Sequence, residues 1–426
     1  MGKAPISAQN LIDGIDPAEV GELALALGQI ASPSGQEHAV SDYVFDWCAE
    51  AGLAPSRLRA DGDRAANILA RIPGSGGGKS LLFNSHLDTA VQPDDTTYFR
   101  EPDRAEYTTA WRDGDDLVGI GVVNDKGPMA AWLVAAAHLR QRGEQLPGDV
   151  ILTAVTGEIG FEPVDEFQGL GYHGKDFGSR YAATHGAVAD LVVVAETTSF
   201  VPVLVEPGKA FFRISIPGRD TGVYTPYLQR PYETAEHPNA VVRAAALIPR
   251  IEQWALEYQE RSRAIHPGGE VVPKVNIGAI RAGHPSQPIL TPAECRLYLD
   301  VRLVPGANPM DVLEELRELL FDSGADVTCY LFRRGYEAVG AEVLTDALVE
   351  ATQHELGEAH VASTGHSASS MWRDLNVWNE LGMPAVTFGP GVGTGGGGNA
   401  SLPLDDLAKA SRIYLRVMTD ICQRPR

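Results

Sequence analysis

The sequence has few cysteines and no long apolar run. Its four cysteines are widely spaced, and no two of them form a Cys-x-x-Cys pair. This excludes a thiolate metal site of the usual spacing and a dense disulfide framework, and it indicates reduced thiols that pack in a core. Apolar stretches of about eighteen residues, the length that spans a membrane, do not occur. The N-terminal stretch lacks the apolar core of a secretory signal, so we expect a cytoplasmic protein.

Basic residues are also in short supply. The chain has 35 Lys and Arg against 56 Asp and Glu, which gives a formal net charge of -21. Such a surface repels phosphates overall, so we expect neither a nucleic acid nor an anionic membrane as partner. A small anionic substrate, a carboxylate for example, is compatible with this charge because its binding needs only a local Arg or His. The 426 residues, 44% of them hydrophobic, are enough for a sizeable core and two domains.

Apolar patterns of helical and of strand type alternate along most of the chain. Helical spacing recurs near 17–30, 37–51 and 128–142, and apolar strand-like runs occupy 66–73, 80–88, 149–158 and 189–197. This rhythm predicts an α/β fold with a mostly parallel sheet covered by helices. From about Gly208 two long amphipathic helices and four strands form a separate α+β pattern. We therefore predict a catalytic domain at 1–207 and 334–426 and an inserted domain at 208–333.

Metal-binding residue types follow several of these apolar runs. His86 and Asp88 lie two apart at the end of one run, so on a strand they share a face. Glu158 and Glu196 each follow a later run, although an acidic residue there is commonly a helix cap or part of a solvated turn.

Between these runs, a Gly-rich passage delivers Asn124 and Asp125 to the start of a helix. The carboxyl ends of parallel strands lie at one edge of a sheet, so all these side chains can converge there. An imidazole together with oxygen donors predicts a site for a divalent metal ion such as zinc or manganese.

These motifs resemble those of the metal-dependent exopeptidases and deacylases, the family that includes carboxypeptidase G, acetylornithine deacetylase and peptidase T. The shared segments are SHLD, GIGVVNDKG, TGEIG, VVVAETT and GMPAVTFGPG, and the likeness extends to NIGAI and LDVRLVP in the inserted domain. The resemblance implies that the insertion is a ferredoxin-like lid or dimerisation domain. It also implies a homodimer or higher homo-oligomer acting on a small molecule.

The departures from the family pattern concern its second metal ion. Family members usually hold two ions bridged by a carboxylate, but here Asn124 occupies the bridging position and Asp125 comes one residue later. Ile159 stands where a second glutamate is usual, and Asn399 or a glycine stands where a late histidine is usual. An isoleucine cannot bind a metal. The resemblance therefore implies one metal ion per subunit.

By the same resemblance, the ligands of that single ion are His86, Asn124 and Glu196, with Asp125 as the alternative to Asn124. An amide oxygen suits a harder, six-coordinate ion, so we expect manganese in preference to zinc. Glu158 occupies the position of the family's general base and would take a proton from a metal-activated water. Asp88 would hydrogen-bond the far nitrogen of His86 and fix its tautomer.

Substrate contacts are predicted from the same pattern. Family members commonly supply a histidine from the inserted domain, and this chain has Gly222 there, so His237 is the candidate replacement, unless it is only a neighbour of a helix cap. His366 and Arg373 occupy positions of substrate contacts. Arg373 would hold a carboxylate with two hydrogen bonds, the alternative being a helix-surface arginine. The two tryptophans nearby are expected in the core.

The loss of a second metal and of that histidine argues against ordinary peptide hydrolysis. The departures resemble those of a one-metal aminohydrolase that converts 5-nitroanthranilate to 5-nitrosalicylate and ammonia. Attack on the ring carbon needs no carbonyl oxyanion hole, because the para nitro group takes the developing charge. A dipeptidase or N-acyl amino-acid deacylase is the alternative, and a non-catalytic metal-binding or ligand-binding relative is a third hypothesis.

Overall fold

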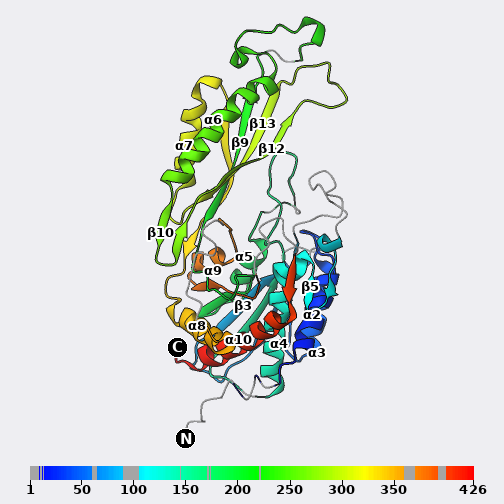
Figure 1. Ribbon diagram of the computed structural model, residues 1–426, viewed down its shortest axis with the longest axis vertical. Coiled ribbons are helices and arrows are strands. Elements are labelled where there is room, and N and C mark those ends of the chain that lie inside the picture. Colours follow the sequence, from blue (N-terminus) through cyan, green and yellow to red (C-terminus); the bar gives the residue numbers. More distant parts are fainter. Residues whose placement is uncertain are drawn as a thin grey trace. The chain divides into compact units, whose positions relative to one another are not determined.

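The chain divides into two compact units, which are described here one at a time (Figure 1). The computed structural model describes residues 9, 12, 14–59, 65–89, 105–143, 145–169, 172, 174–219, 222–358, 370–391 and 400–426. The first unit comprises Met1–Leu204, Glu337–His366 and Arg373–Arg426, and the second comprises Val205–Tyr336 and Ser367–Trp372. Among the described helices, none combines the length and the apolar character needed to cross a bilayer.

The first unit is built on a six-stranded sheet in the order β1-β2-β6-β3-β7-β16. The four strands β6, β3, β7 and β16 run parallel, whereas β1 and β2 are antiparallel to their neighbours. The strand bounds are β1 Ser56–Leu58, β2 Asn67–Ile72, β3 Leu81–His86, β6 Val150–Val155, β7 Leu191–Val194 and β16 Ala385–Thr387. A separate three-stranded sheet joins β4 Trp111–Asp113, β5 Asp116–Val118 and β17 Ser401–Pro403.

Helices cover both faces of the large sheet because its central strands are buried on both sides. Leu81 and Phe83 of β3 pack into one hydrophobic cluster with α2, α4, α8 and α10, whereas Leu82 packs into another with α5 and α9. The helix bounds are α2 Pro17–Gln29, α3 His38–Glu50, α4 Gly127–Gln141, α5 Phe177–Thr184, α8 Glu342–Leu356, α9 Leu375–Glu380 and α10 Leu404–Gln423. These layers confirm the predicted α/β fold.

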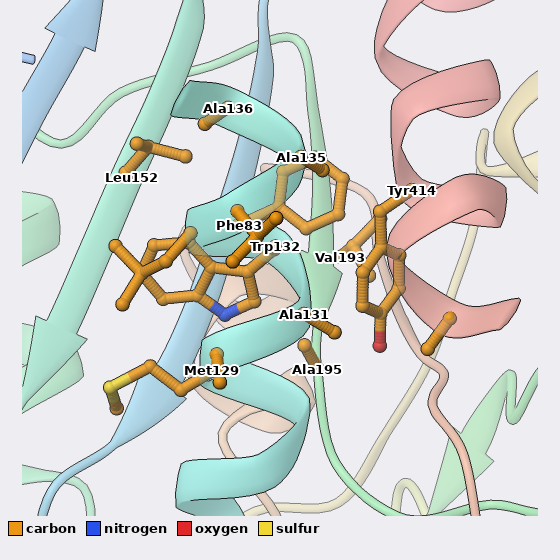
Figure 2. Close-up of a cluster of buried hydrophobic side chains, with 14 of the residues drawn as sticks. Phe83, Met129, Ala131, Trp132, Ala135, Ala136, Leu152, Val193, Ala195 and Tyr414 are labelled. Carbon is orange, nitrogen blue, oxygen red and sulfur yellow. The ribbon is translucent and has the colours of Figure 1, made fainter. Parts of the chain in front are cut away.

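Helix α4 lies at the centre of this core and is apolar on nearly every face, so it needs neighbours all round. Figure 2 shows its Trp132 packed beside Phe83 of β3 and Leu152 of β6, with Tyr414 of α10 close by. The indole nitrogen of Trp132 donates a hydrogen bond to Ser85 Oγ at 3.0 Å. This contact ties the helix to the end of β3, where the metal-binding residue types begin.

The second unit contains a four-stranded antiparallel sheet in the order β12-β13-β9-β14. Helices α6 and α7 pack with the apolar side chains of its strands in one cluster. The main elements are β9 Gly208–Pro217, α6 Ala240–Arg261, β12 Val275–Ala282, β13 Glu294–Leu303, α7 Pro309–Leu320 and β14 Asp326–Arg333. Shorter strands are β8 Val205–Glu206, β10 Ala264–His266, β11 Gly269–Val271 and β15 Tyr336–Glu337. The order of two helices and four strands is the predicted α+β unit.

Asparagine caps begin both helices of the second unit. The side chains of Asn239 and Asn308 each accept a hydrogen bond from the backbone N–H two residues on, at the starts of α6 and α7. This bond satisfies one of the four backbone donors that a helix leaves unpaired at its start.

Candidate metal site

Three parallel strands bring their C-terminal ends to one edge of the large sheet. His86 is the last residue of β3 and lies opposite Val155, the last residue of β6. Glu158 follows β6 by three residues, and Glu196 follows β7 by two. All three side chains are buried, with exposed fractions of 1% for His86, 3% for Glu158 and 6% for Glu196. The convergence predicted from the parallel sheet is therefore present.

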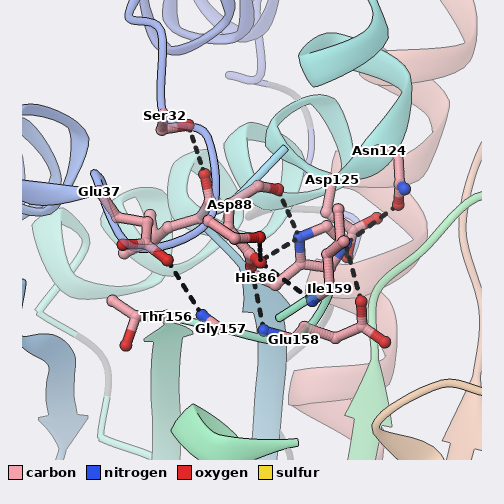
Figure 3. Close-up of polar contacts among 12 residues, drawn as sticks. Ser32, Glu37, His86, Asp88, Asn124, Asp125, Thr156, Gly157, Glu158 and Ile159 are labelled. Carbon is pink, nitrogen blue, oxygen red and sulfur yellow. Dashed lines mark hydrogen bonds and ion pairs between the residues drawn. The ribbon is translucent and has the colours of Figure 1, made fainter. Parts of the chain in front are cut away.

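Asn124 and Asp125 reach the same place from a helical turn and not from a strand. They belong to the π-helical segment η3 (Val122–Lys126), which leads directly into α4. Asn124 interrupts this turn with an extended backbone, at φ -139° and ψ 89°. Both side chains lie against the imidazole of His86, as Figure 3 shows. Both Asn124 and Asp125 are therefore close enough to His86 to bind the same ion.

The two ring nitrogens of His86 have different surroundings. Nδ1 lies 2.9 Å from the backbone carbonyl oxygen of Asp88, which can only accept a hydrogen bond, so Nδ1 carries the proton. In the neutral form of His86, which is the form that binds a metal, Nε2 then presents a lone pair to three oxygen atoms: Asn124 Oδ1 at 3.0 Å, Asp125 Oδ2 at 3.7 Å and Glu158 Oε2 at 3.9 Å. A cation among these atoms removes the repulsion between the facing lone pairs.

Unpaired carboxylate oxygens give a second indication of a cation. His86, Asp125 and Glu196 each offer one ligand atom, and these atoms all lie within 4.8 Å of one another. Among the described residues, neither carboxylate oxygen of Asp125 has a hydrogen-bond partner, and neither has Oε1 of Glu196, although all three are buried. Buried polar atoms are rarely left unpaired. The donor set of one imidazole and two carboxylates fits zinc or manganese, with Asn124 as a further oxygen donor.

The electrostatics of the cluster lead to the same conclusion. Burial raises the pKa of Asp125 well above its usual value, and Glu196 and Glu158 nearby raise it further. Burial also raises the pKa of Glu196. Burial alone would lower the pKa of His86, but Asp125, Asp88 and Glu158 together raise it well above its usual value. Without a cation the cluster therefore retains protons, which a bound metal would displace.

Asp88 is buried, and its carboxylate holds the loop that carries Glu158. It accepts hydrogen bonds from the backbone N–H groups of Glu158 at 3.0 Å and Ile159 at 2.9 Å, and from Ser34 Oγ at 2.7 Å. Burial opposes its ionisation, but the adjacent His86 and these donors lower its pKa to about 2. Asp88 also meets the far nitrogen of His86, as predicted: its backbone carbonyl accepts a hydrogen bond from Nδ1, and its Oδ1 lies 3.5 Å from the same nitrogen.

Residues 82–420, most of the chain, match peptidase family M20/M25/M40. The chain is a member of this family. It is therefore a metal-dependent hydrolase, which confirms the resemblance stated above.

Relatives of this M20 chain are named for different activities. It is 22% identical to an N-formyl-4-amino-5-aminomethyl-2-methylpyrimidine deformylase of Bacillus subtilis, over 92% of each chain. A tripeptidase of Staphylococcus aureus shares the fold with a TM-score of 0.68, at 17% identity over 96% of this chain and all of that one. The Bacillus subtilis YXEP protein, described as a dinuclear metal binding peptidase, matches with a TM-score of 0.61 at 15% identity over 96% and 98%.

Two basic residues contact the acidic side chains of this M20 site. Lys175, which precedes α5, places Nζ 3.2 Å from Oε1 and 3.4 Å from Oε2 of Glu158. Arg373, which precedes α9, places Nε 2.7 Å from Oε2 of Glu196. Lys175 could not be predicted from the sequence, because it is not part of any recognised motif. Arg373 was predicted as a substrate clamp, and the structure adds a contact with a candidate ligand.

The remaining predicted residues fall into three groups. His237 belongs to the second unit, is buried, and accepts a hydrogen bond from Asn239 N at 3.0 Å beside the start of α6, so the cap alternative describes its contacts. Gly222 also belongs to the second unit, at φ +66°. His366 and Asn399 lie outside the described residues. Trp372 and Trp378 are buried, as expected.

Proposed function

We propose that this M20 chain is a one-metal hydrolase whose ion is held by His86, Glu196 and Asp125, with Asn124 beside them. The cluster of unpaired, buried oxygens around His86 Nε2 carries this proposal. Ile159 supports a single ion, because it stands where the family pattern has a second glutamate and its side chain has no metal-binding atom. The chain also has no histidine after His366.

The chain's own groups can perform the proton transfers of hydrolysis. A divalent ion in the cluster would act as a Lewis acid on a water molecule. Glu158 lies beside the cluster with Oε2 facing His86 Nε2, so it is placed to accept a proton from that water and to pass it to a leaving amine. Asp88 fixes the loop of Glu158 through two backbone N–H groups and the orientation of His86 through its own carbonyl.

For the substrate we propose an aromatic amine with an adjacent carboxylate, with 5-nitroanthranilate as the compound to test. In this reaction a water oxygen bonds to the ring carbon, the carbon–nitrogen bond breaks, and the amine leaves as ammonia after receiving the proton held by Glu158. The ring nitro group accepts the charge that develops during attack. The support is the loss of the second metal's ligands and of the inserted domain's histidine, where Gly222 stands.

Amide hydrolysis is the second candidate, favoured by the relatives. The deformylase of Bacillus subtilis and the tripeptidase of Staphylococcus aureus are both named for cleavage of carbon–nitrogen bonds next to a carbonyl group. A purified, manganese-loaded sample should be assayed with 5-nitroanthranilate, an N-formyl amine and a panel of dipeptides and N-acyl amino acids. We expect ammonia and a colour change only from 5-nitroanthranilate. Turnover of an amide alone would replace our proposal with the second candidate.

The metal, the assembly and the location complete the proposal. We propose manganese, because an amide oxygen and two carboxylates are hard donors. Elemental analysis after loading with manganese or zinc should give one ion per chain, and two ions per chain would contradict a one-metal site. A homodimer and a cytoplasmic location remain predictions, the first to be measured by light scattering.

A further inference from the structure

Each acidic side chain that flanks His86 on the strand ends is paired with a basic residue from another segment. Lys175 contacts both oxygens of Glu158, and Arg373 contacts one oxygen of Glu196. The pairs are nearly buried, with side-chain exposure of 19% for Lys175, 4% for Glu158, 13% for Arg373 and 8% for Glu196. At this depth solvent screens the charges little, so each pair contributes strongly to the local potential.

The positive charge of Lys175 and Arg373 can be compared with that of a divalent ion. Asp125, Glu158 and Glu196 carry three negative charges when ionised, and the two basic side chains leave one of these uncompensated. A single divalent ion together with Lys175 and Arg373 brings four positive charges to these side chains. Two divalent ions without Lys175 and Arg373 would bring the same four. The two basic side chains thus supply the same positive charge as one divalent ion.

Ile159 also bears on a second ion, because it stands where the family pattern has a second glutamate. The Bacillus subtilis YXEP protein is described as binding a dinuclear metal centre. In this chain the side chain of Ile159 offers no donor, and its backbone N–H is used by Asp88. Lys175 contacts both oxygens of Glu158, so its charge adds to the repulsion that a further ion near that carboxylate would meet.

From these observations we propose that Lys175 is a positioning residue for Glu158, and that its charge, together with that of Arg373, takes the place of a second metal ion. The inference rests on the proposed one-metal hydrolase and adds to it the source of the missing charge. Lys175 holds both oxygens of the carboxylate, so that Glu158 faces the metal cluster instead of binding an ion itself.

Lys175→Met tests this inference with two readouts of opposite sign. Removing a positive charge near the cluster should tighten Mn²⁺ binding roughly tenfold, measured by competition with a chelator. The same change should lower kcat roughly 100-fold with 5-nitroanthranilate, because Glu158 loses its orientation. A purely structural role would instead weaken both metal binding and turnover.

Three further variants complete the test. Lys175→Arg keeps the charge and should retain the wild-type Mn²⁺ affinity and most of the turnover. Arg373→Met should also tighten Mn²⁺ binding. Lys409→Met is the matched control, because Lys409 pairs with Asp405 at 2.6 Å on α10, one turn along that helix, and it should change neither readout.

The inference is overturned by unchanged turnover or by weaker Mn²⁺ binding in Lys175→Met, by equal losses in Lys175→Met and Lys175→Arg, or by weaker Mn²⁺ binding in Arg373→Met. These results are distinct from a failure of the proposed function. A wild-type chain that binds two Mn²⁺ ions would overturn the one-metal site itself, whatever the variants do. If the wild-type chain turns over only amides, a roughly 100-fold fall in kcat of Lys175→Met on that amide supports the inference, and an unchanged kcat overturns it.

Discussion

Glu158 is the residue on which the proposed chemistry depends most directly. Its carboxylate contacts Lys175 and lies 3.9 Å from Nε2 of His86, and its backbone N–H donates a hydrogen bond to Asp88. These contacts fix the carboxylate without including it in the cluster of His86, Asp125 and Glu196. A substitution of Glu158 can therefore remove the proposed base without removing a metal ligand.

Glu158→Gln should abolish turnover while the metal stays bound. The amide keeps the size of the side chain but cannot accept a proton from water, so we expect kcat to fall by roughly 10²-fold to 10⁴-fold. Metal content by elemental analysis should remain at the wild-type level. Retained activity in this variant would remove Glu158 as the base, and loss of the metal would instead make it a ligand.

Glu37 is a buried carboxylate whose ionisation should make stability depend on pH. It accepts a hydrogen bond from Gly157 N at 3.2 Å, in the loop before Glu158. Burial raises its pKa to about 7 from 4.5, and Asp88 adds to the rise. A carboxyl group with a raised pKa stabilises the fold fully below its unfolded pKa, and this contribution is lost as the pH rises through the folded pKa.

Glu37→Gln should therefore become the more stable protein as the pH increases. The difference from wild type should grow between about pH 4.5 and pH 7 and then level off, with a total change of at most about 3 kcal/mol. Denaturant unfolding of both proteins at several pH values measures it. A difference that is constant with pH would show that Glu37 does not titrate in this range.

The sequence could identify the strand-end residues but not their partners. His86, Glu158 and Glu196 follow apolar runs, and parallel strands necessarily end at the same edge, so their convergence could be predicted. Lys175 lies 17 residues from Glu158 in sequence, in a segment without a motif. Contacts of long side chains from irregular segments depend on the packed fold, so neither Lys175 nor Glu37 could be assigned in advance.

Among the elements, the turn η3 is the one whose position depends most on its neighbours. Helix α2 packs against it through Gly28, where an added Cβ atom would lie 2.5 Å from Val122 Cγ2 and 2.8 Å from Ala110 Cβ. Val122 is the first residue of the turn that carries Asn124 and Asp125. The glycine thus permits a close approach that sets where these two side chains lie.

Gly28→Ala should weaken metal binding as well as stability. The extra methyl group must displace Val122, at a cost of about 1–3 kcal/mol in the free energy of unfolding, and it should shift Asp125 away from His86. Gly21→Ala on the same helix is the control, because its Cβ would meet only the side chain of Leu404, 2.4 Å away on α10. A Mn²⁺ affinity that is equal in both variants would show that the packing of α2 at Gly28 does not affect the metal site.

The elements themselves were largely predictable from periodicity, with one informative exception. The helices at 17–29 and 127–141 and the buried strands begin and end close to the expected residues, because long apolar patterns determine which faces are buried. The π-helical turn was not foreseen. Its residues have the pattern of a helix start, whereas the turn packs against α2 and three strands, β3, β5 and β17, that are distant in sequence.

For the whole molecule, the metal is expected to be part of the stability as well as of the activity. Removal of the ion by a chelator leaves Asp125 and Glu196 buried near each other with raised pKa values. At a free Mn²⁺ concentration about 1,000 times the Kd, binding should add about 4 kcal/mol to the free energy of unfolding. Thermal unfolding with and without Mn²⁺ measures the difference.

This stabilisation should increase with pH. Metal binding requires the deprotonated forms of His86, Asp125 and Glu196, whose pKa values are all raised, so protons compete with the ion more strongly as the pH falls. The gain in Tm on adding Mn²⁺ should therefore be larger at pH 8 than at pH 5.5. A gain that does not change with pH would place the ion elsewhere.

The ion pairs of Lys175 and Arg373 affect how much metal the enzyme must obtain. Charges that are part of the polypeptide are made with every copy, whereas an ion must be taken from whatever pool surrounds it. The proposed one-metal centre takes half of its positive charge from side chains, so it needs to bind only one ion before it can work. Such an enzyme should stay functional at trace-metal levels that leave a two-ion relative half loaded.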